Sequence, residues 1–223
     1  MVLRPLLVHA DGLLRGSGAF HPARAAELPA WTFPLITLAF APLYGALMGS
    51  FHFDSAERIR QVAYSGIKMP LLLFASTLVC LPGFFVLNTV LGLREDFRQS
   101  VKAILAGQAG LGVIVASLGP LTRFFYFCTS DYRAALLFNL AALAVSTVAG
   151  QFVMLRYYRV LIRRNRRHRL MLLAWLGLYA FVGIQMAWML RPFVGDPTMR
   201  VSFFRAEPFS NAYVVVFRLI FRR

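Results

Sequence analysis

The side chains that could do acid–base or nucleophilic chemistry are placed in a way that argues against catalysis. The four histidines are scattered, and the sequence contains no HExxH, no GxSxG and no phosphate-cradling glycine loop. All nine acidic residues fall outside the long apolar stretches: Asp11, Glu27, Asp54, Glu57, Glu95, Asp96, Asp131, Asp196 and Glu207. Ion-coupled carriers commonly place carboxylates inside the membrane. We therefore expect a non-enzymatic protein with no catalytic residue, no metal and no cofactor.

Five amide side chains inside apolar stretches are the remaining groups that could line a path or a pocket. They are Asn88, Gln108, Asn139, Gln151 and Gln185. Such amides usually bond between helices, at about 0.6 kcal/mol each on average. The alternative is a small transporter or channel that uses these amides and a helix break at Pro82-Gly83.

Basic side chains form the strongest binding signal. Seven arginines lie between Arg156 and Arg169, in the segment RYYRVLIRRNRRHR. Arginines near a membrane surface attract anionic headgroups at about 1 kcal/mol each. The expected contacts with lipid headgroups, or with an acidic partner protein, are Arg156, Arg159, Arg163, Arg164, Arg166, Arg167, Lys68 and Arg191.

Composition places these arginines in a membrane protein rather than in a nucleic-acid-binding protein. The 223 residues are 59% hydrophobic and 15% charged, with a net charge of +15. Soluble domains are about 45–50% apolar and about 25% charged. A nucleic-acid binder spreads basic residues over a soluble face, whereas here they lie between apolar runs. The expected partners are membrane lipids, especially anionic ones, and other membrane protein subunits, with no nucleic acid.

Five apolar stretches are long enough to cross a hydrocarbon core of about 30 Å. They are 31–51, 69–91, 103–122, 134–155 and 170–190. The sequence therefore predicts an all-α, polytopic transmembrane helix bundle at 31–190. An interfacial or cytoplasmic arm precedes it at 1–30, and an extramembrane segment with a C-terminal interfacial helix follows at 191–223. Pro82-Gly83 lies within the second stretch, where a kinked full span is favoured over a re-entrant hairpin.

Amphipathic segments are expected to lie at the membrane surface. One is the N-terminal segment 2–14. The other is Asp54–Gly66, where Asp54 and Glu57 form a capping box. Ile59, Val62 and Ala63 share one apolar face of this second segment, which predicts a helix in the headgroup plane.

Small residues mark the expected helix contacts. Gly45 and Gly49 form a GxxxG pattern, and Gly107 and Gly110 lie in a stretch rich in alanine and glycine. Glycine lets two helix backbones approach closely. Packing within this chain is favoured over dimerisation.

The distribution of basic residues predicts an orientation. With five spans, lysines and arginines number 13 on the side of the N-terminus and 11 on the other side. The totals differ little, so the dense arginine segment decides, because the positive-inside bias is strongest in short loops next to spans. We expect the protein to lie in the inner membrane of a bacterium, with the N-terminus and this segment on the cytoplasmic side.

Two short motifs carry a resemblance. SGIKMPLL at 65–72 and WMLRPFVGDP at 188–197 resemble segments of a family of uncharacterised bacterial multi-pass proteins. The layout resembles, more distantly, the Yip-type five-span membrane proteins, which in eukaryotes act in vesicle traffic and small-GTPase handling. The resemblance implies a helical membrane fold and no catalytic residues. The expected function is a non-catalytic membrane scaffold or accessory subunit that contacts anionic lipid and a larger membrane complex.

Overall fold

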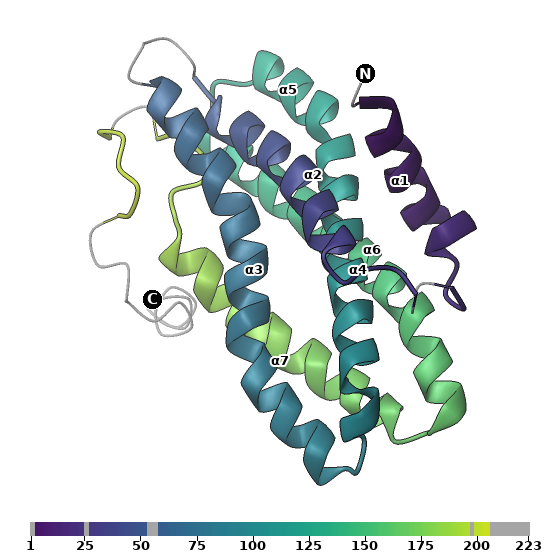
Figure 1. Cartoon of the computed structure of the whole chain (residues 1–223). Helices are drawn as coiled ribbons and strands as arrows, with labels where there is room; N and C mark the ends of the chain where they lie inside the picture. Colours follow the sequence, from purple (N-terminus) through teal and green to yellow (C-terminus); the bar gives the residue numbers. More distant parts are fainter. Residues whose placement is uncertain (1–2, 25–26, 53–57, 197–198, 206–223) are drawn as a thin grey trace.

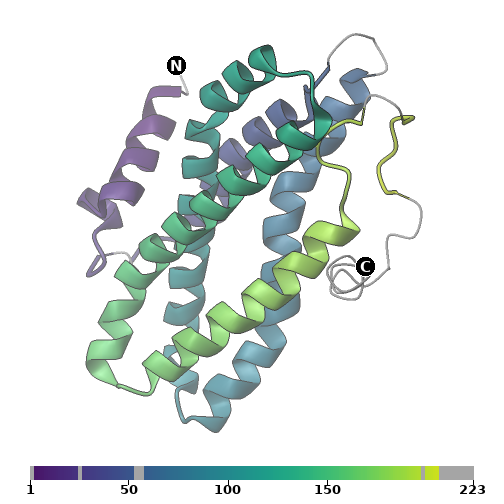
Figure 2. The same cartoon turned by 180° about the vertical axis from the view of Figure 1, so that it is seen from behind.

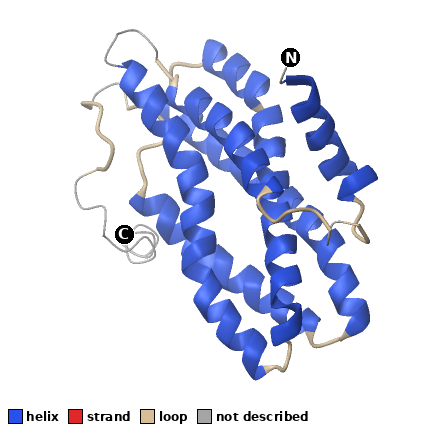
Figure 3. Cartoon of the chain, in the orientation of Figure 1, coloured by secondary structure: helices blue, strands red, loops and turns tan. Residues whose placement is uncertain are grey.

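The chain folds into a bundle of helices, which confirms the predicted fold class (Figure 3). The computed structural model describes residues 3–24, 27–52, 58–196 and 199–205, and these contain no strand. The elements are α1 (Leu3–Arg15), η1 (Gly18–Phe20), α2 (Thr32–Gly49), α3 (Arg58–Val90), η2 (Arg94–Asp96), α4 (Phe97–Ser117), α5 (Gly119–Cys128), α6 (Tyr132–Arg164) and α7 (His168–Met189).

Five helical segments are long and apolar enough to cross a membrane. They are Thr32–Gly49, Arg58–Val90, Arg94–Cys128, Tyr132–Arg164 and His168–Met189. The third combines α4 and α5, and the short α5 begins with Gly119-Pro120. The chain is thus built as a multi-pass membrane protein.

The connections gather at two ends of the bundle (Figure 1). One end holds the turns before α2, between α3 and α4, and between α6 and α7. The opposite end holds the connections from α2 to α3 and from α5 to α6, together with the segment after α7. We call the first the basic end, because the arginines of the α6–α7 turn lie there.

α3 runs through the whole bundle without interruption. Its 33 residues include Pro82 and Gly83, and at about 1.5 Å per residue they span about 50 Å. The re-entrant alternative is therefore wrong, since the helix continues past both residues. Gly92, with a φ of 72°, ends α3 in the left-handed conformation that glycine adopts most easily.

The centre of the bundle consists of α2, α3, α4 and α6, which approach closely where glycines replace larger residues. A Cβ on Gly49 would lie 2.7 Å from the carbonyl oxygen of Gln61 in α3, and one on Gly45 would meet the backbone of Ser65. A Cβ on Gly107 would lie 2.7 Å from the Cβ of Met154 in α6. The predicted small-residue positions thus lie at contacts within this chain.

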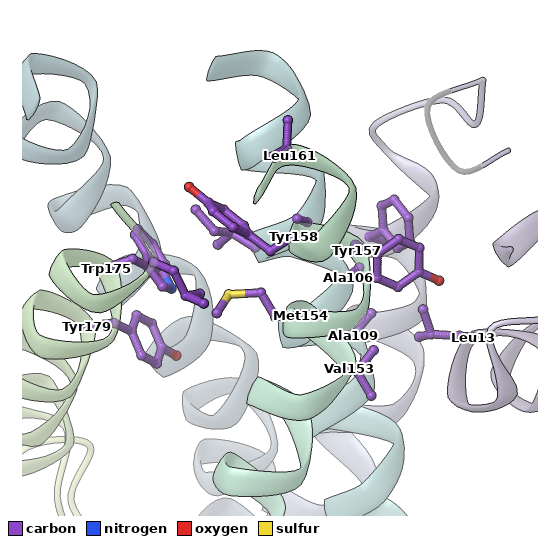
Figure 4. Packing of buried hydrophobic residues seen from close by; sticks show 14 of the residues in the cluster. Leu13, Ala106, Ala109, Val153, Met154, Tyr157, Tyr158, Leu161, Trp175 and Tyr179 are labelled. Atoms are coloured by element: carbon purple, nitrogen blue, oxygen red, sulfur yellow. The ribbon is translucent and has the colours of Figure 1, made fainter. Parts of the chain in front are cut away.

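α1 lies along the outside of the bundle rather than apart from it. Ala10 and Leu13 on its inner face are buried. Figure 4 shows Leu13 pointing toward the contact between α4 and α6, where Ala109 and Val153 meet. The predicted helix in the N-terminal arm is present, and it packs against the bundle.

Of the sequence expectations about surface helices, the structure changes the one at Asp54–Gly66 and does not test the one near the C-terminus. The expected interfacial helix near the C-terminus, at 210–221, lies outside the described residues, as does the capping box at 54–57. Arg58–Gly66 forms no separate helix in the headgroup plane, because it is the beginning of α3.

Candidate functional site

The arginine-rich segment is mostly helix. α6 continues through Arg164, and only residues 165–167 separate it from α7. Asn165 ends α6 in an extended conformation, and its side-chain oxygen accepts a hydrogen bond from the backbone N–H of Arg167. The prediction of a loop from Arg156 to Arg169 is therefore wrong at both ends. Arginine is a good helix former, so a run of arginines does not end a helix.

Two of these arginines tie neighbouring segments to the basic end. The guanidinium of Arg156 donates a hydrogen bond of 2.7 Å to the carbonyl oxygen of Leu14, at the end of α1. The guanidinium of Arg167 donates to the carbonyl oxygen of Leu91 at 3.1 Å, just after α3. These two arginines are therefore used in the fold and are less available to a ligand.

Asp96 contacts two basic side chains at the basic end. One carboxylate oxygen lies 3.1 Å from Nε2 of His168, which is fully buried at the start of α7. The other lies 3.6 Å from the guanidinium of Arg164, which also donates to Gln99 at 3.4 Å. Asp96 therefore connects the start of α4 with both α6 and α7. We call these two helix ends and residues 165–167 between them the arginine hairpin.

The remaining arginines continue an apolar stripe on the outer face of α6. Val145, Val148 and Phe152 are more than half exposed and follow one face of the helix. Arg159 and Arg163 lie farther along the same face and are exposed. The distance along the helix from Val145 to Arg163 is about 27 Å at about 1.5 Å per residue, which is close to the thickness of a hydrocarbon core.

Four arginines at this end are exposed and have no side-chain partner among the described residues. They are Arg159, Arg163, Arg166 and Arg169. A phospholipid beside the outer face of α6 would place its acyl chains next to the apolar residues and its phosphate next to the arginines. This match of depth and charge makes the basic end the first candidate binding surface.

The opposite end contains a buried polar face on the first turns of α3. Arg58, Gln61, Ser65 and Lys68 lie on the inner face of α3 and are at most 8% exposed. Ile59, by contrast, is 58% exposed. The apolar face thus points outward, as it would in an interfacial helix, but the polar face contacts protein instead of the headgroup region.

The segment after α7 supplies the partners of this polar face. The ammonium group of Lys68 donates a hydrogen bond of 2.8 Å to the carbonyl oxygen of Pro192. The amide of Gln61 donates to the carbonyl oxygen of Phe193 at 3.3 Å, and so does the hydroxyl of Ser65. The guanidinium of Arg58 donates to the carbonyl oxygen of Asp196 at 2.9 Å.

These contacts correct the role expected for Lys68. The side chain was predicted to extend to lipid headgroups, yet it is fully buried, and its ammonium group lies 4.8 Å from the ring centroid of Phe203. A buried ammonium group needs acceptors, and the chain itself supplies them. Arg191 also turns inward, with its guanidinium 3.5 Å from the ring centroid of Trp188.

The two sequence motifs that carry the family resemblance therefore meet in space. Ser65 and Lys68 belong to the first motif, and Pro192, Phe193 and Asp196 belong to the second. An ion pair of 3.3 Å also joins Asp196 to Arg205. A helical spacing of polar residues at 58, 61, 65 and 68 was a visible signal for this contact in the sequence.

The intramembrane amides mostly bond within the protein. Asn139 accepts a hydrogen bond of 2.9 Å from the hydroxyl of Tyr44 and donates one of 2.6 Å to the hydroxyl of Tyr126. Gln108 accepts from the hydroxyl of Tyr179 at 3.0 Å. These bonds join α2 to α6, α5 to α6 and α4 to α7.

Asn88 bonds within its own helix, and the Pro82-Gly83 pair lies on the outer surface of α3. The amide of Asn88 donates to the carbonyl oxygen of Phe84, one turn back in its own helix. Pro82 and Gly83 are both exposed on the outer face of α3. Gln185 lies half-buried on α7 and has an interaction partner.

A cavity of about 470 Å³ lies between α6 and α7, and its floor comes from α3 and α4. Gln151 is the one member of the amide set that lines it, and Asn88 does not. Ser76 of α3 also lines it and is fully buried. This cavity could not be inferred from the sequence.

Comparison with protein-family models, curated proteins and solved structures finds no match for this chain. The candidate sites must therefore be interpreted from their own geometry. The resemblance in the two motifs remains an expectation.

Proposed function

We propose that this protein is a non-catalytic integral membrane scaffold or accessory subunit that binds anionic phospholipid at its basic end. The observation that carries the proposal is the outer face of α6, where exposed apolar residues lead directly to Arg159 and Arg163. An anionic lipid beside this face would place its chains along Val148 and Phe152 and its phosphate at the guanidinium groups.

The large apolar surfaces of α6 and α7 support a role in assembly. Leu137, Val145 and Phe152 on α6 are more than half exposed, and so are Leu173 and Phe181 on α7. In a membrane, these surfaces contact either lipid chains or the spans of another subunit. Neither the Pro82-Gly83 pair nor Asn88 lines the cavity, so the cavity does not support a path at that position of α3.

We further propose that the basic end faces the cytoplasm of a bacterial cell, in the inner membrane. Residues preceding α2, the α3–α4 turn and the arginine hairpin lie together at this end, which concentrates basic side chains next to the span ends. The exposed thiol of Cys128 lies at the opposite end, on the last residue of α5.

The lipid proposal is tested by substituting three arginines that have no partner among the described residues. The triple variant Arg159→Gln, Arg163→Gln and Arg166→Gln removes about 3 kcal/mol of attraction at about 1 kcal/mol per residue, equivalent to roughly a 100-fold loss of affinity. Binding of phosphatidylglycerol is measured by native mass spectrometry after purification in a mild detergent.

A matched control removes the same charge from the opposite end. Arg60, Arg133 and Arg200 are also exposed, and their triple change to glutamine is expected to leave phosphatidylglycerol binding within about threefold of the wild type. Equal losses in both triple variants would show a general effect of net charge and would contradict a site at the basic end.

Orientation is tested with the natural thiol. In intact cells, a membrane-impermeant maleimide is expected to label Cys128. A protein with Cys128→Ser and Asn165→Cys is expected to react only after the membrane is permeabilised. The reverse pattern would place the basic end outside and would contradict the proposed orientation.

A further inference from the structure

The cavity between α6 and α7 is a second candidate binding site. It is separate from the exposed arginines Arg159 and Arg163 on the outer face of α6, which we call the arginine stripe. The two helices are joined by residues 165–167 at the basic end, yet α7 packs mainly on α3 and makes fewer contacts with α6 (Figure 2). The space left between them has a volume of about 470 Å³. Cavities of about 300–1,000 Å³ are typical of small-molecule sites.

The cavity opens sideways rather than toward either end of the bundle. Leu140 and Val148 on α6, and Ile184 on α7, line it and are each more than half exposed on the outer surface of the spans. In a membrane, this opening faces acyl chains. A ligand therefore enters from the bilayer and must be soluble there.

The lining excludes a charged ligand. None of the described residues that line the cavity is charged, and most are leucine, alanine, valine or isoleucine. An ion at this depth would lack a counter-charge, which is costly in a membrane interior. The ligand must be neutral and largely apolar.

Two residues that line the cavity each carry a buried polar atom without a partner, and these atoms indicate the polar group that a ligand would need. Ser76 is fully buried, and its hydroxyl has no hydrogen-bond partner among the described residues. Its neighbour Thr77 uses its own hydroxyl to bond the carbonyl oxygen of Leu73 at 2.8 Å. On the α6 side of the cavity, the side-chain oxygen of Gln151 is also buried without a partner in the described part of the chain.

These two atoms are a donor and an acceptor. A single hydroxyl group can form a hydrogen bond with each of them, because it can accept from the Ser76 hydroxyl and donate to the Gln151 oxygen. Ser76 and Gln151 lie near the middle of α3 and α6. The hydroxyl must therefore reach the middle of the bilayer, as a compact neutral head can and a phosphate cannot.

We propose that this cavity binds the chain of a neutral membrane lipid whose single hydroxyl group lies between Ser76 and Gln151. The site is independent of the arginine stripe, since it takes a different class of lipid at a different depth. Loss of phosphatidylglycerol binding in the arginine variants would leave it unaffected.

The test compares three probes that share one chain length: hexadecanol, hexadecane and palmitate. Binding to the full-length protein in nanodiscs is measured by native mass spectrometry. Hexadecanol is expected to bind about tenfold more tightly than hexadecane, because only the alcohol can form hydrogen bonds with Ser76 and Gln151. Palmitate is expected to bind more weakly than the alcohol. Equal binding of hexadecane and hexadecanol would overturn the proposal.

Two substitutions locate the site. Gly183 lines the cavity and has no neighbouring atom within 4 Å of a Cβ position, so Gly183→Phe fills the space and is expected to abolish hexadecanol binding. Gly177 has equally open surroundings on the same helix but lies outside the cavity, so Gly177→Phe is the matched control and is expected to bind normally.

Ser76→Ala separates the hydroxyl contact from the volume of the cavity. It is expected to weaken hexadecanol binding about fivefold to tenfold and to leave hexadecane binding unchanged. Unchanged hexadecanol binding in Ser76→Ala, or in a folded Gly183→Phe protein, would refute the site. If Gly183→Phe does not fold, the alcohol-to-alkane ratio in Ser76→Ala decides.

Discussion

Substitution of Gly45 by alanine tests the closest helix contact in the molecule. A Cβ at this position would lie 2.9 Å from the carbonyl carbon of Ser65 in α3, and closer still to its oxygen. These are backbone atoms, so no rotation of a side chain relieves the clash. Carbon atoms pack at about 3.5–4.0 Å, so α2 and α3 would have to separate by at least about 0.6 Å.

The expected loss of stability follows from two opposing effects. Overpacking of a close contact costs about 1–3 kcal/mol, and replacing glycine by alanine in a helix returns up to about 1 kcal/mol. Gly45→Ala should therefore lower the free energy of unfolding by about 1–2 kcal/mol. At Gly66, in the same α2–α3 contact, the nearest atom would be 3.5 Å from the new Cβ, so Gly66→Ala should be neutral or slightly stabilising.

The assay is reversible unfolding in mixed micelles with increasing sodium dodecyl sulfate, followed by circular dichroism. The two variants add the same atoms to the same helix pair, so the difference between them isolates the clash. We expect a difference of about 1–3 kcal/mol, which is the cost of the overpacked contact alone. If Gly45→Ala were as stable as Gly66→Ala, the close approach of α2 and α3 at Ser65 would be wrong.

Three further predictions concern buried polar contacts. Asn139→Leu leaves two tyrosine hydroxyls without their amide partner and should destabilise the protein by about 1–2 kcal/mol in the same unfolding assay. Tyr179→Phe removes the donor to Gln108 and should cost about 1 kcal/mol, whereas no change would show that this bond is not formed. Lys68→Met removes a donor that holds the segment after α7, so trypsin should cleave at Arg200 several times faster, and an unchanged rate would contradict the contact.

The fold could be predicted from sequence to the extent that hydropathy determines it. The expected spans 31–51, 69–91 and 170–190 correspond to α2, α3 and α7, because about 20 apolar residues have few alternatives to a membrane helix. The helix ends were less predictable. α6 extends nine residues beyond the expected end at Leu155, since arginines and tyrosines continue a helix readily.

The polar face of α3 shows why the site was only partly predictable. The periodicity of Ile59, Val62 and Ala63 predicted a separate helix in the headgroup plane, whereas these residues belong to the first turns of α3. The apolar face points outward in either arrangement, but in the bundle the polar face finds its partners in protein. The spacing of the polar residues at 58, 61, 65 and 68 indicates that a partner exists, but the partners of Gln61 and Ser65 come from a segment more than 100 residues away, which the spacing does not identify.

The cavity depends on the angle between helices, which no local pattern specifies. Gln151 was identified as an intramembrane amide, but Ser76 was missed because serine in an apolar helix usually bonds its own backbone. Only the absence of such a bond, visible in the folded arrangement, distinguishes Ser76 from its neighbour Thr77.

The most direct test of the central claim is to find where an anionic lipid contacts the protein. Phosphatidylglycerol with a photoreactive group in its headgroup is incorporated into nanodiscs, activated by light, and mapped on the protein by peptide mass spectrometry. The account predicts crosslinks concentrated on the peptides around Arg159 and Arg163, and their loss in the triple glutamine variant. Crosslinks spread equally over both ends of the bundle, or unchanged in that variant, would contradict it.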